Sequence, residues 1–308
     1  MTTQCNLIVD SCCDLPASIL DKEGVYLLQF PYIDEAGERM DDLYQSITPK
    51  EFYDGMREGN MPSTAQIPMP HLQAAIDWAK EQEKPCVWLS FSSGLSGTFG
   101  TIDMLVGQAK EADPSLELEL VDTHLASIAE GFLVFEALRQ RERGLTASEL
   151  AAWAREAQWF VNCGFMVDDL KALQHGGRIP ASVAFAGSKL DVKVLLSFDL
   201  DGKLSMVGVA RGRKKGLKAL AERYAKGCDK ASETRTVLLG NADCEKDMQR
   251  LRELILKEDA SAMPLESSIG PVIGSHVGPG MVAVVYWGDD RRKAVSVSDR
   301  IANRVKGN

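Results

Sequence analysis

A cluster of hydroxyl groups and glycines directly follows a strongly apolar segment near residue 90. The apolar run 86–91 leads into Ser92-Ser-Gly-Leu-Ser-Gly-Thr98, in which four residues bear a hydroxyl group and two are glycines. Glycine lets a ligand approach the backbone closely, and hydroxyl groups donate hydrogen bonds without adding charge. Three chemistries fit such a segment: nucleophilic attack by a serine, binding of a phosphate, and binding of another anion such as a carboxylate.

The nucleophile interpretation rests on Ser96. The nucleophile-elbow motif Gly-x-Ser-x-Gly begins correctly at Gly94, but Thr98 stands where the second glycine is required. Ser96 could still form a catalytic triad with His276 and Asp122, because triads are defined by their geometry and not by a motif. An acyl hydrolase that uses Ser96 and His276 therefore remains an alternative.

The phosphate interpretation lacks its motif. No Gly-x-x-x-x-Gly-Lys-Ser/Thr segment occurs, and no lysine lies between residues 85 and 109. Binding of a carboxylate requires neither this motif nor a lysine. A helix that begins within 92–98 presents free N–H groups, and the hydroxyl groups add further hydrogen-bond donors. The same residues are also typical of plain helix capping, so both interpretations stay open.

Three further polar loops contain residues suited to anion binding. They are Met61-Pro-Ser-Thr-Ala-Gln66, Gln174-His-Gly-Gly-Arg-Ile179 and Gly274-Ser-His-Val-Gly-Pro-Gly280. Arg178 follows a glycine pair, where the backbone can come close to a ligand, and His276 precedes a glycine–proline turn. Each loop taken alone is equally typical of an exposed turn.

Composition excludes several classes of protein. The chain has 308 residues, enough for two domains, with 45% hydrophobic and 26% charged residues, as in ordinary globular proteins. A formal net charge of −9 argues against a nucleic-acid binder. The first residues do not resemble a signal peptide, no window resembles a membrane span, and none of the seven cysteines forms a Cys-x-x-Cys pair. We therefore expect a reduced, cytoplasmic protein that binds no metal and no other cofactor.

Strands and helices alternate over the first half of the chain. Continuous apolar runs predict buried strands, and apolar residues at helical spacing predict amphipathic helices. The expected strands are 5–10, 25–33, 86–91 and 116–122, and the expected helices are 49–58, 70–83, one ending near 112, 125–143 and 146–160. This alternation predicts a parallel α/β sheet with helices on both faces.

Strands follow one another more closely after residue 161. Asp201-Gly202 predicts a tight antiparallel hairpin between two of them. The expected strands are 163–167, 193–199, 204–210, 235–240, 265–269 and 282–287, with helices at 212–226 and 245–258. We expect an α/β fold with an N-terminal parallel α/β sheet domain, residues 1–162, and a C-terminal α+β domain with a mainly antiparallel sheet, residues 163–308. Residues 289–308 form a polar tail of unassigned role.

Taken together, the motifs resemble those of the DegV family, the fatty-acid-binding subunits of bacterial fatty acid kinase. Each motif is short, but their order and spacing match the family along almost the whole chain. The matching segments are Ile8-Val-Asp-Ser11, Asp14-Leu-Pro16, Pro62-Ser-Thr-Ala-Gln66, Ser92-Ser-Gly-Leu-Ser-Gly-Thr98, Val121-Asp-Thr123 with Gly131, Val167-Asp-Asp-Leu170, Gly176-Gly-Arg-Ile179, Arg211-Gly-Arg-Lys-Lys215 and His276-Val-Gly-Pro-Gly280.

The resemblance implies a non-catalytic carrier that binds one long-chain fatty acid between and within its two domains and presents the carboxyl group to a separate kinase. By this resemblance Thr64 and Ser96 match the hydroxyl groups that bind the carboxylate, while Arg178 and His276 match residues near the head group. Ser63 and Ser93 are neighbouring candidates. A basic stretch matches one that faces the kinase in the family; it consists of Arg211, Arg213, Lys214 and Lys215. The alternative interpretation is that these residues are simply the solvent-exposed start of a helix.

Two departures from the family pattern affect the site. Ala65 stands where the family usually has serine, which removes one hydroxyl group, and Cys12-Cys13 replaces the usual Thr-Ala of the first motif. The loss of one donor weakens carboxylate binding without abolishing it if Arg178 and His276 remain. Besides the hydrolase, a lipid-sensing module without a kinase partner stays an alternative.

Overall fold

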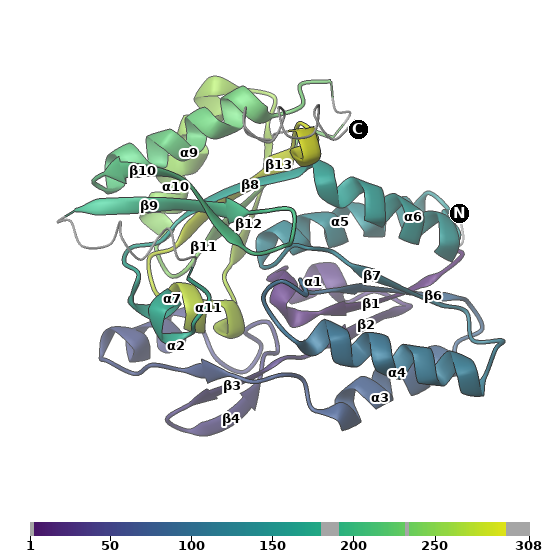
Figure 1. Cartoon of the computed structure of the whole chain (residues 1–308). Helices are drawn as coiled ribbons and strands as arrows, with labels where there is room; N and C mark the ends of the chain where they lie inside the picture. Colours follow the sequence, from purple (N-terminus) through teal and green to yellow (C-terminus); the bar gives the residue numbers. More distant parts are fainter. Residues whose placement is uncertain (1–2, 180–190, 232–233, 294–308) are drawn as a thin grey trace, which may run out of the picture.

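The computed structural model describes residues 3–179, 191–231 and 234–293, whose elements form alternating layers of helix and sheet (Figure 1). One pair of helices covers the outer face of the first sheet, and a second pair lies on its inner face. A third pair covers the outer face of the second sheet. These pairs are α3 (Met69–Glu81) with α4 (Thr98–Ala112), α5 (Ile128–Glu142) with α6 (Ala147–Ala157), and α9 (Arg213–Gly227) with α10 (Glu245–Glu258).

The first sheet is parallel throughout, with the order β2-β1-β6-β7, as the alternation of strands and helices predicted. Every residue of β1 and β6 is buried, because helices cover both faces of the sheet. Leu7 lies in register with Val25 on one side and Val87 on the other. The strands are β1 (Asn6–Asp10), β2 (Val25–Leu28), β6 (Cys86–Ser90) and β7 (Leu118–Asp122).

The second sheet has the order β10-β9-β8-β13-β11-β12 and is antiparallel except between β11 and β12, which confirms the mainly antiparallel prediction. The Asp201-Gly202 hairpin is present, with Gly202 at a φ of +71° that favours glycine. The strands are β8 (Val161–Met166), β9 (Val192–Phe198), β10 (Leu204–Arg211), β11 (Thr236–Asn241), β12 (Met263–Ser268) and β13 (Val282–Trp287).

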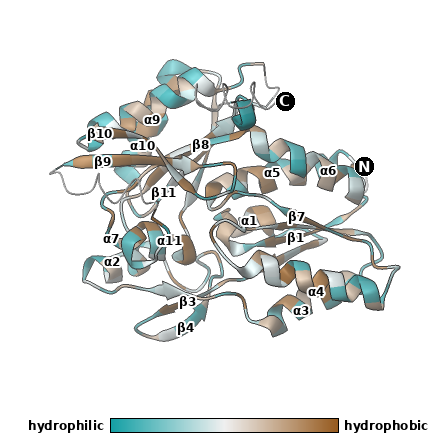
Figure 2. Cartoon of the chain, in the orientation of Figure 1, coloured by the Kyte–Doolittle hydropathy of each residue, from teal (hydrophilic) through white to brown (hydrophobic). Residues whose placement is uncertain are grey.

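Alternation along β13 divides the second half of the molecule into two apolar layers. Val284 and Tyr286 pack with α9 and α10, whereas Ala283 and Val285 face the layer of α5. Figure 2 shows hydrophobic colouring on β9 of this sheet and mixed hydrophobic and hydrophilic colouring along α9, which lies over the sheet. Helix α5 packs on both sheets and is buried on nearly all sides, so it forms the central layer of the molecule.

A small sheet, β4-β3-β5, was not predicted, and neither were two short helices that form walls of the site described below. The predicted strand 25–33 is in fact two strands, because the chain bends between β2 and Pro31, the first residue of β3. The elements that were not predicted are β4 (Gly37–Met40), β5 (Ser63–Thr64), α1 (Ala17–Leu20), α7 (Lys171–His175) and α11 (Pro271–Val277), with single turns at η1 (Ser11–Cys13), η2 (Gln158–Phe160) and η4 (Arg291–Lys293). The second part of the predicted strand is β3 (Pro31–Asp34), and the helix predicted over 49–58 is present as α2 (Pro49–Arg57).

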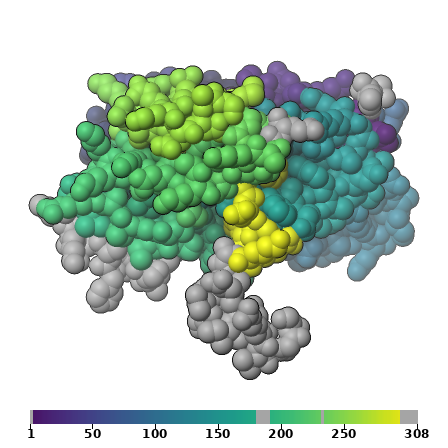
Figure 3. Space-filling view, turned by 90° about the horizontal axis from the view of Figure 1, so that it is seen from above, coloured from purple at the N-terminus to yellow at the C-terminus, as the bar shows by residue number. Residues whose placement is uncertain are grey.

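The two halves of the chain meet through specific polar contacts. The hydroxyl of Ser92 donates to the carbonyl of Gly202 in the β9–β10 turn, at 2.9 Å. Arg291 donates to the carbonyls of Phe198 and Gln158, at 3.2 Å each, and stacks over Trp159. Figure 3 shows this last described segment, in yellow, at the junction between the teal and green parts of the chain.

The predicted boundary between domains, at 162/163, lies inside β8, the first strand of the second sheet. The division into 1–162 and 163–308 stays a prediction, and α5, which precedes the boundary, packs against β8, β11 and β13 of the second sheet. Of the predicted polar tail, 289–293 is part of the structure and 294–308 lies outside the described residues.

Several carboxyl groups are buried in the first half of the molecule without an ion-pair partner among the described residues. Asp10 accepts hydrogen bonds from the backbone N–H groups of Cys12 and Phe91, at 3.0 and 2.9 Å. Burial nevertheless raises the pKa of Asp10 to about 7 and that of Asp41 to about 7. Burial, together with the neighbouring carboxyl group of Asp10, also raises the pKa of Glu130 well above its ordinary value. These groups favour a protonated state in the folded protein.

The substitution Asp41→Asn should stabilise the protein increasingly as the pH rises from about 4 to about 7. In this range the folded protein retains a proton on Asp41 that the unfolded chain releases, so the free energy of unfolding falls with rising pH. The expected gain of the variant over the wild type grows by about 1.4 kcal/mol per pH unit. Urea titrations at pH 5, 6 and 7 measure it.

The matched control is Asp103→Asn, which changes an exposed carboxylate on α4 in the same way. Its difference from the wild type should stay constant with pH. A constant difference for Asp41→Asn as well would show that Asp41 is ionised in the folded protein.

Candidate functional site

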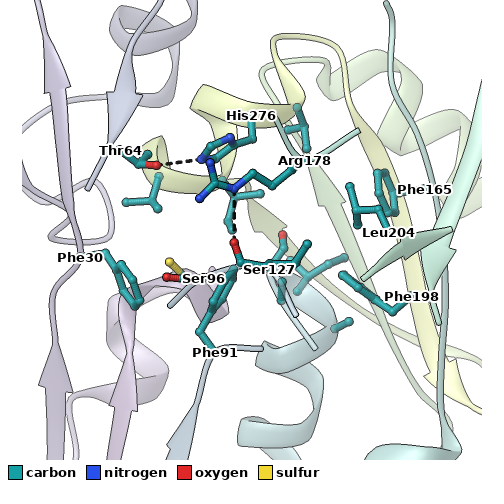
Figure 4. Close-up of a pocket in the computed structure, with 18 of the residues that line it drawn as sticks. Phe30, Thr64, Phe91, Ser96, Ser127, Phe165, Arg178, Phe198, Leu204 and His276 are labelled. Atoms are coloured by element: carbon teal, nitrogen blue, oxygen red, sulfur yellow. Dashed lines mark hydrogen bonds between the residues drawn. The ribbon is translucent and has the colours of Figure 1, made fainter. Parts of the chain in front are cut away.

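A cavity of about 210 Å³ lies between the two halves of the chain, bordered by both sheets and by the starts of several helices. Most of its wall is apolar and aromatic, and its polar side chains are few (Figure 4). The apolar lining includes Cys12, Phe30, Phe91, Ala126, Ile128, Ala129, Cys163, Phe165, Leu173, Phe198, Leu204, Val272, Ile273, Val277, Met281, Ala283 and Val285.

Thr64 and His276 meet at the polar end of the cavity. The Oγ1 atom of Thr64 lies 2.8 Å from Nε2 of His276, although the two residues are 212 positions apart in the sequence (Figure 4). Thr64 ends the short strand β5, and His276 belongs to the last turn of α11, so the small sheet and this helix bring them together. The pairing of these two predicted residues is a direct consequence of the fold.

His276 is uncharged at neutral pH. Burial lowers its pKa to about 4, and the positive charges of Arg178 and His175 act in the same direction. Its Nδ1 atom is buried without a hydrogen-bond partner and faces Gly176, where a Cβ would lie only 2.1 Å away. A hydrogen on Nδ1 would have no acceptor, so the tautomer with hydrogen on Nε2 is favoured. Nε2 then donates to Thr64, whose own hydroxyl hydrogen is free to point at a ligand.

Arg178 supplies positive charge at the same end. Its Nε donates to the carbonyl of Leu95, at 3.2 Å, and its NH1 donates to that of Gly176, at 2.6 Å. These bonds extend the side chain from the segment after α7 across to the loop that contains Ser96. Arg178 is exposed and Thr64, Ser96 and His276 are half-buried, so the polar end of the cavity is nearest to solvent.

Ser96 lines the cavity and also caps α4. Its hydroxyl donates to Oγ1 of Thr98, at 3.0 Å, and accepts from the backbone N–H of Thr98, at 3.2 Å. The start of α4, with its partial positive charge, therefore borders the cavity through Ser96 and Gly97. Capping and anion binding, which the sequence left open as alternatives, are compatible here.

Ser63 and Ser93 do not line this cavity. Both are exposed, and Ser63 lies on the opposite face of β5 from Thr64, because side chains alternate along a strand. The backbone N–H of Ser93 donates to Asp122, at 3.2 Å, which directs this part of the loop away from the cavity. If the strand β5 had been recognised in the sequence, the alternation of side chains along it would have placed Ser63 and Thr64 on opposite faces.

Ser96 and His276 do not form a nucleophile–base pair in this structure. The hydroxyl of Ser96 is bonded to Thr98 and the ring of His276 to Thr64, and among the described residues no carboxylate is hydrogen-bonded to the ring. Asp122, the third member of the possible triad, accepts instead from Ser93 and His124. An activated serine needs a base in hydrogen-bond reach that is itself oriented by a third group.

The basic stretch after β10 separates into two kinds of residue. Arg213 is held internally: it forms ion pairs with Asp247 and Asp168 and donates to the carbonyl of Gly280, at 2.6 Å. Arg211, Lys214 and Lys215 are exposed at the end of β10 and the start of α9. Of the four basic residues in this stretch, these three are exposed and could contact a partner, whereas Arg213 is held by its ion pairs.

Sequence reasoning missed two polar residues of the cavity wall. Ser127, at the start of α5, and Gln66, after β5, both line it. A serine directly before an apolar helix is a typical N-cap, and this signal could have drawn attention to Ser127. The aromatic residues Phe30 and Phe91, whose ring centroids lie 5.7 Å apart, gave no signal that separates a cavity wall from ordinary core.

No group of histidine, cysteine, aspartate or glutamate side chains in the described ranges is arranged to bind a metal ion. In the same ranges, no helix combines the length and the apolar character that crossing a membrane requires.

These features define a class of protein: a layered α/β protein with a largely apolar cavity between its halves and a small polar cluster at one end of it. The chain belongs to the DegV family, whose model, described as an uncharacterised protein of that family, matches residues 4–289. A DegV domain-containing protein of Clostridium perfringens is 34% identical over 286 residues, which cover 92% of this chain and 98% of the relative.

Two solved structures extend the comparison. A fatty-acid-binding DegV family protein from Thermus thermophilus has a TM-score of 0.81 and 26% identity, covering 93% of this chain and all of that one. A fatty-acid-binding DegV family protein from Streptococcus agalactiae has a TM-score of 0.80 and 26% identity, covering 94% and 100%. The fold predicted from the family resemblance is thereby confirmed, and structural relatives of this chain bind fatty acids.

The imidazole of His276 should stay neutral down to about pH 5 in the ligand-free protein, because burial and Arg178 oppose its protonation. The unfolded chain takes up this proton near pH 6.5, so the contribution of His276 to stability is lost as the pH falls from about 6.5 through 4. NMR of the histidine ring signals across pH 4–8 measures the pKa.

The variant His276→Gln assigns the signal. A midpoint for His276 near 6.5, the ordinary value of a histidine, would contradict the burial described above.

Proposed function

We propose that this chain binds one long-chain fatty acid, with the carboxylate at Thr64, Arg178 and His276 and the acyl chain in the apolar cavity. The observation that carries this proposal is the one-sided polarity of the cavity. Its polar, charged end is nearest to solvent, and most of the rest of its wall is apolar and buried. An amphiphile with a single acidic head and a long apolar tail matches this distribution.

The head-group chemistry supports an anion. A buried carboxylate requires hydrogen-bond donors and a compensating charge. Arg178 provides the charge, the hydroxyl of Thr64 is free to donate when Nε2 of His276 donates to it, and Ser96 and the start of α4 lie beside them. The neutral state of His276 leaves Arg178 as the dominant cation of the site.

The energetics agree with such a ligand. Burial of about 15 methylene groups contributes roughly 12 kcal/mol at ~0.8 kcal/mol each, whereas association costs about 4–15 kcal/mol. Apolar burial alone leaves little net affinity, so the head-group contacts decide whether binding is tight. The fatty-acid binding of structural relatives at 26% identity supports the same ligand class.

Native mass spectrometry of the protein purified from bacteria tests the proposal. We expect an excess mass that denaturation releases as a free long-chain fatty acid. A clean mass of the protein alone, together with no uptake of added oleate or palmitate, would contradict it.

The head-group assignment is tested by Arg178→Ala. Loss of a charged hydrogen-bond donor costs about 1.5–3 kcal/mol, so the affinity for oleate should fall roughly 10- to 100-fold. The affinity for methyl oleate, which has no charge, should change by less than about twofold. Displacement of a fluorescent fatty acid measures both.

Arg155→Ala is the matched control, because Arg155 is an exposed arginine paired with Glu119 and is not part of the cavity wall. Equal losses for oleate and methyl oleate in Arg178→Ala would mean that Arg178 does not bind the carboxylate.

We further propose that the protein acts as a non-catalytic carrier that presents the carboxylate to a separate kinase, which forms the acyl-phosphate. The polar end of the cavity lies nearest to solvent, as such presentation requires. The hydroxyl of Ser96 is engaged in capping α4, which gives no support to the alternative of an acyl hydrolase. Absence of ester or acyl-phosphate turnover by the isolated protein would agree with the carrier.

The exposed cations at the start of α9 are proposed to face the kinase. The double substitution Lys214→Glu with Lys215→Glu should lower kinase-dependent formation of acyl-phosphate at least tenfold, because charge reversal at an interface turns attraction into repulsion. Its affinity for oleate should match that of the wild type, since neither residue lines the cavity. Arg213 is left unchanged because it is bound to Asp168 and Asp247.

Lys80→Glu with Lys110→Glu is the control, with the same change of charge on exposed residues of α3 and α4, far from α9 (Figure 1). Normal phosphorylation by the Lys214/Lys215 variant, or no phosphorylation of the wild type by any kinase of the source organism, would favour a lipid-sensing module instead.

A further inference from the structure

One peptide group at the start of α11 is held on both sides by side chains from the first half of the chain. The carbonyl of Ile269 accepts from the hydroxyl groups of Tyr44 and Tyr53, at 2.7 and 2.8 Å. The N–H of Gly270, in the same peptide group, donates to Oδ1 of Asp14, at 2.9 Å. We call this set of contacts the 269–270 clamp. Its three side chains come from three separate segments of the first half.

Asp14 is the central residue of the clamp. It is almost fully buried and follows the turn η1 with a φ of +51°. Its Oδ2 accepts from the hydroxyl of Ser127, at 2.5 Å, and its carbonyl accepts from the hydroxyl of Ser267. One carboxyl group thus joins the start of α5, which lines the cavity, to the start of α11.

The clamp leaves α11 little freedom. A Cβ at Gly270 would lie 2.6 Å from Oδ1 of Asp14, and a Cβ at Gly274 would lie 2.5 Å from the hydroxyl of Tyr53. Glycines are therefore required at both positions by the close approach of α11 to the first half of the chain. Because α11 lies so close to the first half of the chain, it cannot shift or tilt without breaking the hydrogen bonds of the clamp.

The position of His276 depends on this clamp. His276 lies six residues beyond Gly270 on α11, which rises about 1.5 Å per residue. Its bond to Thr64 measures 2.8 Å, and a hydrogen bond of this kind weakens steeply beyond about 3.2 Å. A small rotation of α11 about its first turn would therefore separate Nε2 from Thr64.

We propose that Asp14 is a positioning residue for the head-group site: by holding the Ile269–Gly270 peptide group together with Tyr44 and Tyr53, it holds His276 against Thr64. This inference rests on the proposed fatty-acid binding for its effect on affinity. Asp14 itself does not line the cavity, so any effect on the carboxylate must pass through α5 and α11.

Competition of oleate and methyl oleate against a fluorescent fatty acid separates positioning from general stabilisation. In Asp14→Ala we expect the affinity for oleate to fall about tenfold and the affinity for methyl oleate to change less than about twofold. The double variant Asp14→Ala with His276→Ala should bind oleate no more weakly than His276→Ala alone, because the two residues act on one contact.

Two conservative variants sharpen the test. Asp14→Asn should retain most of the affinity for oleate, because its amide oxygen can accept from Gly270 and the hydroxyl of Ser127 can turn to accept from its NH2 group. Tyr44→Phe with Tyr53→Phe removes the other side of the clamp and serves in place of Asp14→Ala should the latter fail to fold. Tyr286→Phe is the control: the hydroxyl of Tyr286 donates to the backbone carbonyl of Arg223 within the second half, at 3.0 Å.

Equal losses for both ligands, or losses that add to those of His276→Ala, would overturn the positioning role. A ligand-free measurement keeps it independent of the proposed function: the ring signal of His276 should move in Asp14→Ala and stay in place in Tyr286→Phe. An unmoved signal would overturn the inference even if the wild type binds oleate. Conversely, if the wild type binds neither ligand but the ring signal of His276 moves in Asp14→Ala, the result contradicts the proposed function alone.

Discussion

The site depends on one electrostatic constraint: a carboxylate enters an apolar cavity only where positive charge and hydrogen-bond donors replace the water that it loses. In the proposed head-group site, Arg178, Thr64 and His276 provide these at one end of the cavity. They belong to three segments that are far apart in the chain, so the arrangement of β5, α7 and α11 is what the head-group site requires of the fold. The remaining wall needs only apolar side chains.

The buried carboxyl groups of the protein itself satisfy the same constraint differently. No arginine or lysine of the described ranges pairs with Asp10, Asp41 or Glu130, and burial raises the pKa of all three. Protonation replaces the missing cation. Arg178 lies beside the Ser96 loop, where its positive charge is available to the anion of the proposed site.

Sequence reasoning predicted the features that depend on local patterns. Continuous apolar runs identified β1 and β6, and Asp201-Gly202 identified the hairpin between β9 and β10. It could not pair Thr64 with His276 from spacing alone, because 212 residues separate them; only the family resemblance grouped them. Nor could it distinguish Phe165 or Val285 in the cavity wall from ordinary core, since a cavity depends on the spaces between side chains and not on their types.

The two ends of the cavity differ in their exposure to solvent. Arg178 is exposed at the polar end, whereas Phe165, Phe198 and Val285 are buried between α5 and the second sheet. In the proposed complex, the head group therefore lies nearest to solvent and to a second protein, while the acyl chain lies among the buried apolar side chains. A carrier benefits from this asymmetry, because the reactive group of its ligand can be reached while the apolar chain stays out of water.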